Sequence, residues 1–207
     1  MTFYVLRHGQ TDWNVQMRLQ GSTDIPLNET GRAQAHVAAK ILAGEGITKI
    51  IASPLSRALE TARIVGEASG ITPGIDNRLI ERNFGQFEGM TIDEVHQHRE
   101  EMRDYMNPQA DVDGKHYPWD AEPLPEVIDR VYACVNDYRE TGKCLFVFHG
   151  IPFRAVTRKF LNDMYSSPNA APVRFDADGD KWQMVALDPD NAPIQQIYNA
   201  QTTMGRI

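Results

Sequence analysis

The sequence predicts an α/β fold: a three-layer α/β/α sandwich with a mostly parallel central sheet and a helical cap insertion. Short β-prone runs alternate with segments whose apolar residues recur at helical spacing. The run Cys144–Phe148 is apolar on both faces, which is typical of a central strand in a parallel sheet. A chain of 207 residues suits one domain, so we expect a single domain over 1–207 with the insertion at about 89–125.

The first two strands are each expected to lead into a helix. Thr2–Leu6 is a β-prone run, and Asn28 can cap the helix that follows it. Thr48–Ala52 predicts the second strand, after which Ser53-Pro54 is interpreted as a helix cap with proline in the first turn. The apolar residues expected to face the core are Ala33, Val37 and Ile41 on the first helix, and Leu55, Ala58, Ala62 and Val65 on the second.

The second half repeats this order and ends in a hairpin. Valines at helical spacing predict a helix before the third strand, Cys144–Phe148, and another helix begins near Pro152. Pro172–Asp176 and Trp182–Leu187 predict two strands joined by a turn at Asp178-Gly179. Because such strands can pair across a two-fold axis, a homodimer is one arrangement that they allow.

The stretch Gly89–Pro125 interrupts the alternation of strands and helices. It contains a charged helix, Thr91–Met106, followed by a loop with several prolines. We interpret it as an insertion that could cover one edge of the sheet as a lid.

Arginines and histidines follow the predicted strands at the point where each strand ends. In open α/β sheets the carboxyl ends of the strands form the ligand crevice, and helix N-termini that open there favour anions. The residues expected at this edge are Arg7, His8, Ser53, Arg57, His149 and Gly150. Two arginines and two histidines at one edge predict a phosphate or carboxylate site, whereas scattered surface residues would not repeat the same chemistry at three strand ends.

The composition excludes several classes of function. A net charge of -7 argues against general nucleic-acid binding, which needs a basic face. The apolar runs are too short to span a bilayer, and the N-terminus does not resemble a signal peptide. Two cysteines, Cys134 and Cys144, do not suggest a disulfide framework. We therefore expect a cytoplasmic protein that associates with neither membranes nor nucleic acid.

Five blocks of sequence resemble the histidine phosphatase superfamily, also called phosphoglycerate mutase-like. Arg-His-Gly alone is a weak signal, but five blocks in the right order and spacing are a strong one. The blocks are Leu6-Arg7-His8-Gly9-Gln10-Thr11 with Asn14, Gln20–Leu27 with Gly31 and Gln34, Ser53–Ala62, Leu79–Gly85 with Phe87-Glu88-Gly89, and Phe148-His149-Gly150 with Arg154.

The resemblance implies that His8 attacks phosphorus as a neutral imidazole and becomes a phosphohistidine. Two guanidinium groups nearby would disfavour the imidazolium form, and the Gly9 carbonyl would accept a hydrogen bond from the other ring nitrogen. Glu81 would protonate the leaving oxygen, although Glu88 is a competing candidate. The catalytic residues implied are Arg7, His8, Arg57, Glu81 and His149, and those implied for binding of the substrate or its phosphate are Gly9, Asn14, Arg82 and Gly150.

Arg7, Arg57 and a protonated or donating His149 would hold the transferred phosphoryl group, because a guanidinium binds phosphate bidentately and remains charged. These arginines would repel a metal cation, and no carboxylate cluster accompanies the histidines, so we expect neither a metal nor a cofactor. Ser53 could orient a ligand or only cap its helix, and the cap is the favoured interpretation.

The function expected from these residues is metal-independent hydrolysis of a small phosphorylated metabolite (EC 3.1.3). A cofactor-dependent phosphoglycerate mutase (EC 5.4.2) is the first alternative, because Glu81-Arg82 fits its pattern. Against it, the chain has Leu19-Gln20-Gly21 where mutases carry Gly-Trp, and no adjacent arginine pair between residues 90 and 123. A non-catalytic phosphate-binding domain is the second alternative, which would require the loss of a key group.

Overall fold

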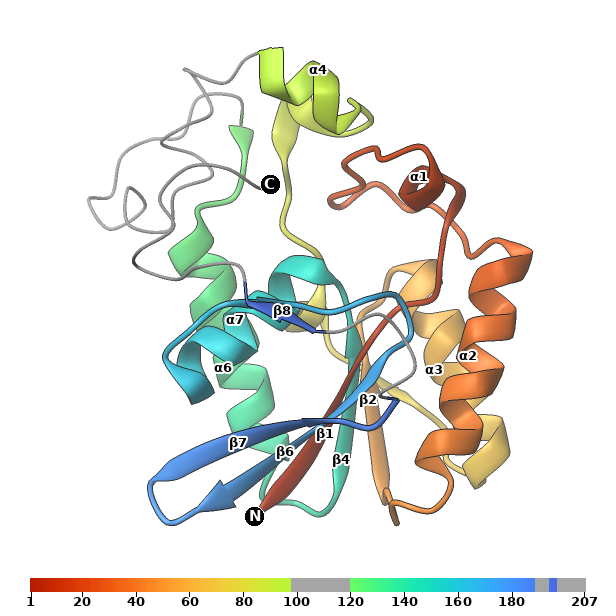
Figure 1. The fold of residues 1–207 in the computed structure, drawn as a ribbon, viewed down its shortest axis with the longest axis vertical. Coiled ribbons are helices and arrows are strands. Elements are labelled where there is room, and N and C mark those ends of the chain that lie inside the picture. Colours follow the sequence, from red (N-terminus) through yellow and green to blue (C-terminus); the bar gives the residue numbers. More distant parts are fainter. Residues whose placement is uncertain (98–119, 189–193, 197–207) are drawn as a thin grey trace.

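The computed structural model describes residues 1–97, 120–188 and 194–196 (Figure 1). Its main sheet has six strands in the order β3-β2-β4-β1-β6-β7. Four of them pair in parallel, namely β1 (Thr2–Arg7), β2 (Lys49–Ala52), β3 (Gly74–Ile75) and β4 (Cys144–Phe148). On the other side of β1, β6 (Pro172–Asp178) and β7 (Lys181–Ala186) form an antiparallel hairpin. A second, two-stranded sheet joins β5 (Tyr165–Ser166) and β8 (Gln195–Gln196).

The uniformly apolar strand β4 lies inside the sheet, as its sequence predicts. It is buried along its whole length, and Leu145 pairs with Tyr4 of β1 on one side and with Ile50 of β2 on the other. A strand covered on both faces must be apolar on both faces, which explains the absence of alternation.

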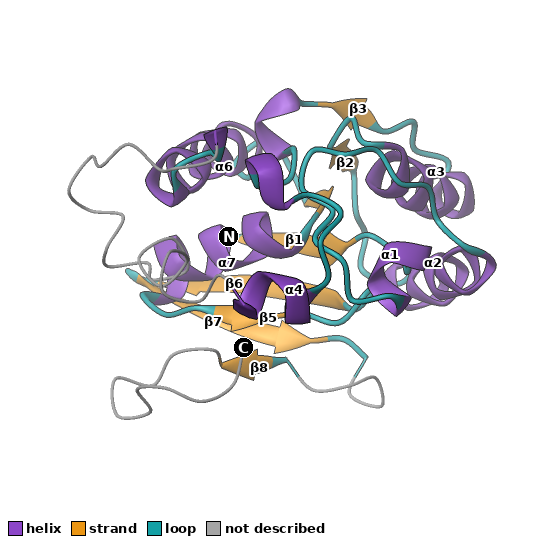
Figure 2. Ribbon diagram, turned by 90° about the horizontal axis from the view of Figure 1, so that it is seen from above, coloured by secondary structure: helices purple, strands orange, loops and turns teal. Residues whose placement is uncertain are grey.

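Helices cover both faces of the sheet, which confirms the three-layer prediction (Figure 2). The helices are α2 (Glu29–Leu42) and α3 (Ser56–Ser69) on one face, and α6 (Leu124–Tyr138) and α7 (Gly150–Leu161) on the other. Successive residues of β1 divide between the two cores: Phe3 and Val5 pack with α6 and α7, whereas Tyr4 and Leu6 pack with α2 and α3.

The face that α2 buries is not the predicted one. Ala33 and Val37 are exposed, and Ile41 is only partly buried. The buried residues are Gly31, Ala35, Ala38, Ala39 and Leu42. The alanines give this helix two apolar stripes, and the stripe of smaller residues packs against the sheet and α3 because it allows closer approach.

The helix after β2 also begins later than predicted. Its first residue is Ser56, and its N-cap position is occupied by Leu55 in an extended conformation. Ser53 therefore lies outside the helix and is not its cap. Its hydroxyl accepts a hydrogen bond from the Leu55 N–H (3.4 Å) and makes a shorter contact that is described below.

Two short helices lie at the end of the sheet to which β1 and β4 point (Figure 1). They are α1 (Asp12–Val15) and α4 (Ile92–Gln97), and two 3-10 helices, η1 (Asn77–Leu79) and η2 (Gly85–Phe87), precede α4. Backbone hydrogen bonds join residues 17–19 to 89–92, including Leu19 N–H to the Met90 carbonyl (2.9 Å). Of the predicted helix Thr91–Met106 only residues 91–97 fall within the described ranges, and of the proposed insertion only residues 89–97 and 120–125. No helix in the described ranges is long and apolar enough to cross a membrane.

Candidate active site

His8 follows β1 directly and is almost completely buried, with 2% of its surface exposed. Its backbone N–H donates to the Phe148 carbonyl (2.9 Å), which extends the pairing of β1 with β4 by one residue. Its ring Nδ1 lies 2.7 Å from the Gly9 carbonyl, the contact that the family resemblance implies. Because a carbonyl can only accept, Nδ1 carries the proton and Nε2 keeps its lone pair.

Burial and positive charge keep this imidazole neutral. The pKa of His8 is held well below its usual value, first by burial and then by the charges of Arg7 and Arg57, against which the hydrogen bond to Gly9 acts weakly. At neutral pH the ring is therefore uncharged, which is the state that a nucleophile requires.

Arg57 enters the site from the first turn of α3 and is fully buried. Its Nη1 donates to the Thr23 carbonyl (2.8 Å) and its Nη2 to the Gly21 carbonyl (2.7 Å). Its Nε donates to Nδ1 of His149 (3.2 Å). The loop after α1 and the second histidine thus fix the plane of this guanidinium.

His149 follows β4, and both of its ring nitrogens contact protein groups. Since Nδ1 accepts from Arg57, the neutral ring carries its proton on Nε2, which lies 2.7 Å from the Ser53 hydroxyl. Burial, followed by the charge of Arg57, lowers the pKa of His149 well below its usual value. Both ring nitrogens are thus engaged by protein groups, so neither is left over for the expected donation to a phosphate. The two imidazole rings lie 5.2 Å apart, centre to centre.

The expectation that Ser53 only caps a helix is wrong. Ser53 is fully buried at the end of β2, where its N–H donates to the Val147 carbonyl (3.0 Å). This pairing aligns its hydroxyl with the histidine that follows the neighbouring strand.

Arg7, the last residue of β1, is the least satisfied cation of the site. Its Nη1 donates to the Ser167 carbonyl (2.8 Å), and its buried Nε has no hydrogen-bond partner among the described residues. Burial lowers the pKa of Arg7 to about 10, so that the group is still charged at neutral pH. Gly150 lies between Arg7 and Glu81, because a Cβ atom there would be 4.0 Å from Arg7 Cζ and 3.7 Å from Glu81 Oε2.

Glu81 is the acidic residue that reaches this group of cations. Its carboxylate accepts hydrogen bonds from the N–H groups of Arg82 (2.9 Å), Gly150 (3.0 Å) and Ile151 (3.2 Å). Burial raises the pKa of Glu81, although those N–H donors and the two arginines oppose the shift. A raised pKa makes proton donation near neutral pH easier.

Glu88, the competing candidate, has a structural role in this arrangement. Its carboxylate accepts from the N–H and hydroxyl of both Ser22 and Thr23, at 2.5 to 3.0 Å, and from the N–H of Phe84 (3.1 Å). It ties the loop that holds Arg57 to the segment after Glu81.

Asn14 and Arg82 lie at the margin of the site. The Asn14 Oδ1 accepts from the Thr11 N–H (3.0 Å) and from Asn169 Nδ2 (3.3 Å), which turns its own NH₂ group away from these partners. Arg82 is buried, its Nε donates to the Glu122 carbonyl (2.7 Å), and its guanidinium lies over the Phe84 ring.

Two supporting residues were missed by the sequence reasoning. Asn169 donates to the His8 carbonyl (3.0 Å), and the Thr61 hydroxyl accepts from the Gly9 N–H (3.1 Å). Asn169 lies in a loop without a motif, but Thr61 belongs to the Ser53–Ala62 block, one turn after Arg57, where its position could have been noticed.

Within the described ranges, no group of three or more histidine, cysteine, aspartate or glutamate side chains is arranged to hold a metal ion. The centre of the site is instead a neutral imidazole between two guanidinium groups, with a buried carboxyl group beside them. Such an arrangement can bind a tetrahedral anion, attack it and donate a proton to it.

The chain is similar to proteins of one family. It matches the profile of the histidine phosphatase superfamily (branch 1) over residues 3–189. It is 38% identical over 151 residues to the Yersinia pestis (strain Pestoides F) protein named "Probable phosphoglycerate mutase GpmB", which covers 72% of this chain and 69% of that one.

Two solved structures extend the similarity to the fold. The mycobacterial glucosyl-3-phosphoglycerate phosphatase complexed with VO3 has a TM-score of 0.77 and is 27% identical, over 88% of this chain and 96% of that one. Bacillus stearothermophilus YhfR has a TM-score of 0.77 and is 30% identical, over 89% and 95%.

Proposed function

Because the chain belongs to branch 1 of the histidine phosphatase superfamily, we propose that it hydrolyses small phosphomonoesters through a phosphohistidine at His8. The observation that carries the proposal is the neutral His8, whose Nε2 keeps its lone pair beside two buried guanidinium groups. The structures of the neighbouring mycobacterial phosphatase in complex with VO3 and with inorganic phosphate support the binding of a phosphate-like anion.

In the first step, Nε2 of His8 attacks phosphorus while the bond from phosphorus to the ester oxygen breaks. Arg7 and Arg57 stabilise the charge on the three equatorial oxygens. Asn14 adds a neutral donor. Glu81 gives its proton to the departing oxygen, which leaves as an alcohol, and the carboxylate that forms keeps its three N–H donors.

In the second step, water replaces the alcohol. Glu81, now ionised, accepts a proton from the water molecule. At the same time the water oxygen attacks phosphorus, and the bond from phosphorus to Nε2 of His8 breaks. Inorganic phosphate leaves, and both His8 and Glu81 return to their starting protonation states.

A phosphoglycerate mutase is the second candidate, favoured by the name of the Yersinia relative. The two functions use the same first step and differ in whether the phosphohistidine passes its group to water or to a second hydroxyl. A mutase depends on a bisphosphorylated primer, whereas a phosphatase releases inorganic phosphate without one.

The test is a panel of phosphomonoesters assayed for phosphate release with wild type, His8→Ala and His36→Ala, with and without primer and chelator. His36 is exposed on α2 and serves as the matched control. We expect His8→Ala to lose all turnover and His36→Ala to keep it. We also expect no effect of chelator, and an acid-labile phosphoryl adduct on quenched wild type only. Activity of His8→Ala within about tenfold of wild type would remove His8 from the nucleophile role. Binding without turnover by wild type would point to a non-catalytic domain.

A further inference from the structure

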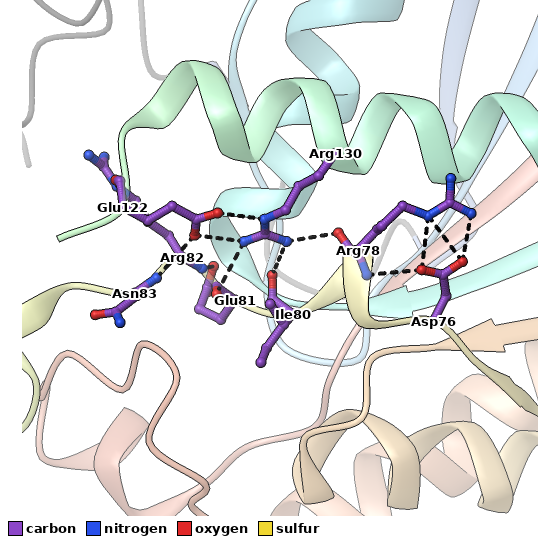
Figure 3. A network of polar contacts seen from close by, with 8 residues as sticks. All are labelled: Asp76, Arg78, Ile80, Glu81, Arg82, Asn83, Glu122 and Arg130. Carbon is purple, nitrogen blue, oxygen red and sulfur yellow. Dashed lines mark hydrogen bonds and ion pairs between the residues drawn. The ribbon is translucent and has the colours of Figure 1, made fainter. Parts of the chain in front are cut away.

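The segment that carries Glu81 has little regular structure of its own. It runs from η1 through Arg82 to Asn83, and its backbone carbonyls turn toward α6 (Figure 3). Arg130 of α6 donates to three of them, the carbonyls of Arg78 (2.8 Å), Ile80 (2.7 Å) and Glu81 (3.3 Å). One guanidinium thus supplies the backbone partners that a strand or helix would otherwise provide.

Glu122 fixes the orientation of that guanidinium. Its two carboxylate oxygens accept from Arg130 Nε (2.6 Å) and Nη2 (2.8 Å), in a bidentate pair whose side chains are only 19% and 18% exposed. The backbone of Glu122 also binds the same segment, since its N–H donates to the Asn83 carbonyl (2.9 Å). Its carbonyl accepts from Arg82 (2.7 Å). The pair therefore holds the chain on both sides of Glu81.

Arg130 has no donor left for a substrate. An arginine offers five N–H groups, and those of Arg130 make five hydrogen bonds, three to the carbonyls and two to Glu122. This distinguishes it from Arg7, whose Nε is unpartnered among the described residues. Any effect of Arg130 on the reaction must therefore pass through the backbone carbonyls that it binds.

The Glu81 carboxyl is the functional group that a change at Arg130 should affect most. Its oxygens are bound by N–H groups at the start of α7, while its backbone is held from α6. The position of the carboxyl thus depends on hydrogen bonds from both helices to Glu81. A proton donor must stay within hydrogen-bond reach of the leaving oxygen, so a small displacement has a large effect on rate.

We propose that Arg130, oriented by Glu122, is a positioning residue that holds Glu81 in place as the proton donor. The inference rests on the proposed phosphatase function. Lysine cannot replace Arg130, because an ammonium has three donors and lacks the planar fork.

The test compares two phosphate esters whose leaving groups differ in how much they need a proton. p-Nitrophenyl phosphate releases a stabilised phenolate that needs little protonation, whereas an alkyl phosphate such as β-glycerophosphate releases an alkoxide that needs it. We expect Arg130→Met to lower kcat/KM, which reports the step that releases the alcohol, at least about tenfold more for the alkyl ester than for the aryl ester, in the same direction as Glu81→Gln. General acid catalysis is typically worth about 10²- to 10⁴-fold, which leaves room for this effect.

A double-mutant cycle separates positioning from general damage. If Arg130 acts through Glu81, then Arg130→Met added to Glu81→Gln should change the ratio of alkyl to aryl turnover by less than about twofold. Asp137→Asn is the matched control. It removes another anchor between α6 and the same segment, the 2.7 Å ion pair with Arg78, but does not touch Glu81. We expect it to leave the ratio unchanged.

Equal losses on both esters with Arg130→Met, or additive effects in the cycle, would overturn the inference. Should Arg130→Met fail to fold in a thermal melt, Arg130→Lys and Glu122→Gln take its place. They must shift the ratio in the same direction, and an unchanged ratio in both also overturns it. If wild type hydrolyses neither ester, the proposed function is wrong. If wild type is active but substitution of Arg130 leaves the ratio of alkyl to aryl turnover unchanged, only the present inference is wrong.

Discussion

The hydrogen bond between Ser53 and His149 provides the sharpest test of the site geometry. Ser53→Ala removes a buried hydroxyl that lies 2.7 Å from Nε2 of His149 and leaves that N–H in the interior without its partner. An unsatisfied buried donor costs about 1–3 kcal/mol, and the void left by one oxygen adds little. We therefore expect the free energy of unfolding, measured by urea titration, to fall by about 1–3 kcal/mol. We also expect kcat/KM to fall, because only Arg57 would then hold the imidazole.

The matched control is Ser56→Ala, three residues further along the chain. The Ser56 hydroxyl donates to Asp24 (2.7 Å) at an exposed position, so water can replace the lost partner. We expect its free energy of unfolding to stay within about 0.5 kcal/mol of wild type. If Ser53→Ala changes stability no more than Ser56→Ala does, the Ser53 hydroxyl does not hold His149.

Two further predictions follow from the same site. His8 and His149 are buried with pKa values well below the usual 6.5, so the unfolded chain takes up protons that the folded chain excludes. Stability should fall as pH drops below about 6.5, by at most about 1.4 kcal/mol per histidine for each pH unit. Part of this loss is offset as Glu81, whose pKa is raised, takes up its proton. Urea titrations at pH 7 and pH 5.5 check this, and equal stabilities would contradict it. Separately, a Cβ atom on Gly31 would collide with the backbone carbonyl of Gln10, two residues after His8, whereas one on Gly44 would meet nothing within 4 Å. Gly31→Ala should therefore lower both stability and kcat/KM and Gly44→Ala neither, and similar kcat/KM values for the two variants would show that the loop after His8 tolerates displacement.

The strand ends could be predicted from the sequence because local and global signals agree there. Arg7, His8 and His149 directly follow apolar runs, and parallel strands bring such positions to one edge whatever the loops between them do. The order of the strands was not needed for this conclusion. Their burial and the lowered pKa values follow from packing that only the folded chain has.

The residues that the sequence did not reveal owe their roles to distant partners. Ser53 before a proline has the local pattern of a cap, and its true partner is His149, 96 positions away. Arg130 stands between the buried Val127 and Val131 like any polar residue of an amphipathic helix. Only the fold brings the carbonyls of residues 78–81 beneath it. Helix α2 has two apolar stripes, and which of them is buried depends on how closely α3 packs against it.

Three arginines of this region, Arg7, Arg57 and Arg130, differ in how many of their donors the protein uses. Arg130 uses all five, Arg57 makes three hydrogen bonds, and Arg7 makes one, counted over the described residues. A buried charged donor without a partner is costly, so the fold tolerates unused donors only where something else satisfies them. Arg7 and Arg57, whose charges act on His8, keep unused donors that an anionic oxygen would satisfy. Arg130 keeps none, and this difference supports the proposals that Arg7 and Arg57 bind the phosphoryl group and that Arg130 positions Glu81.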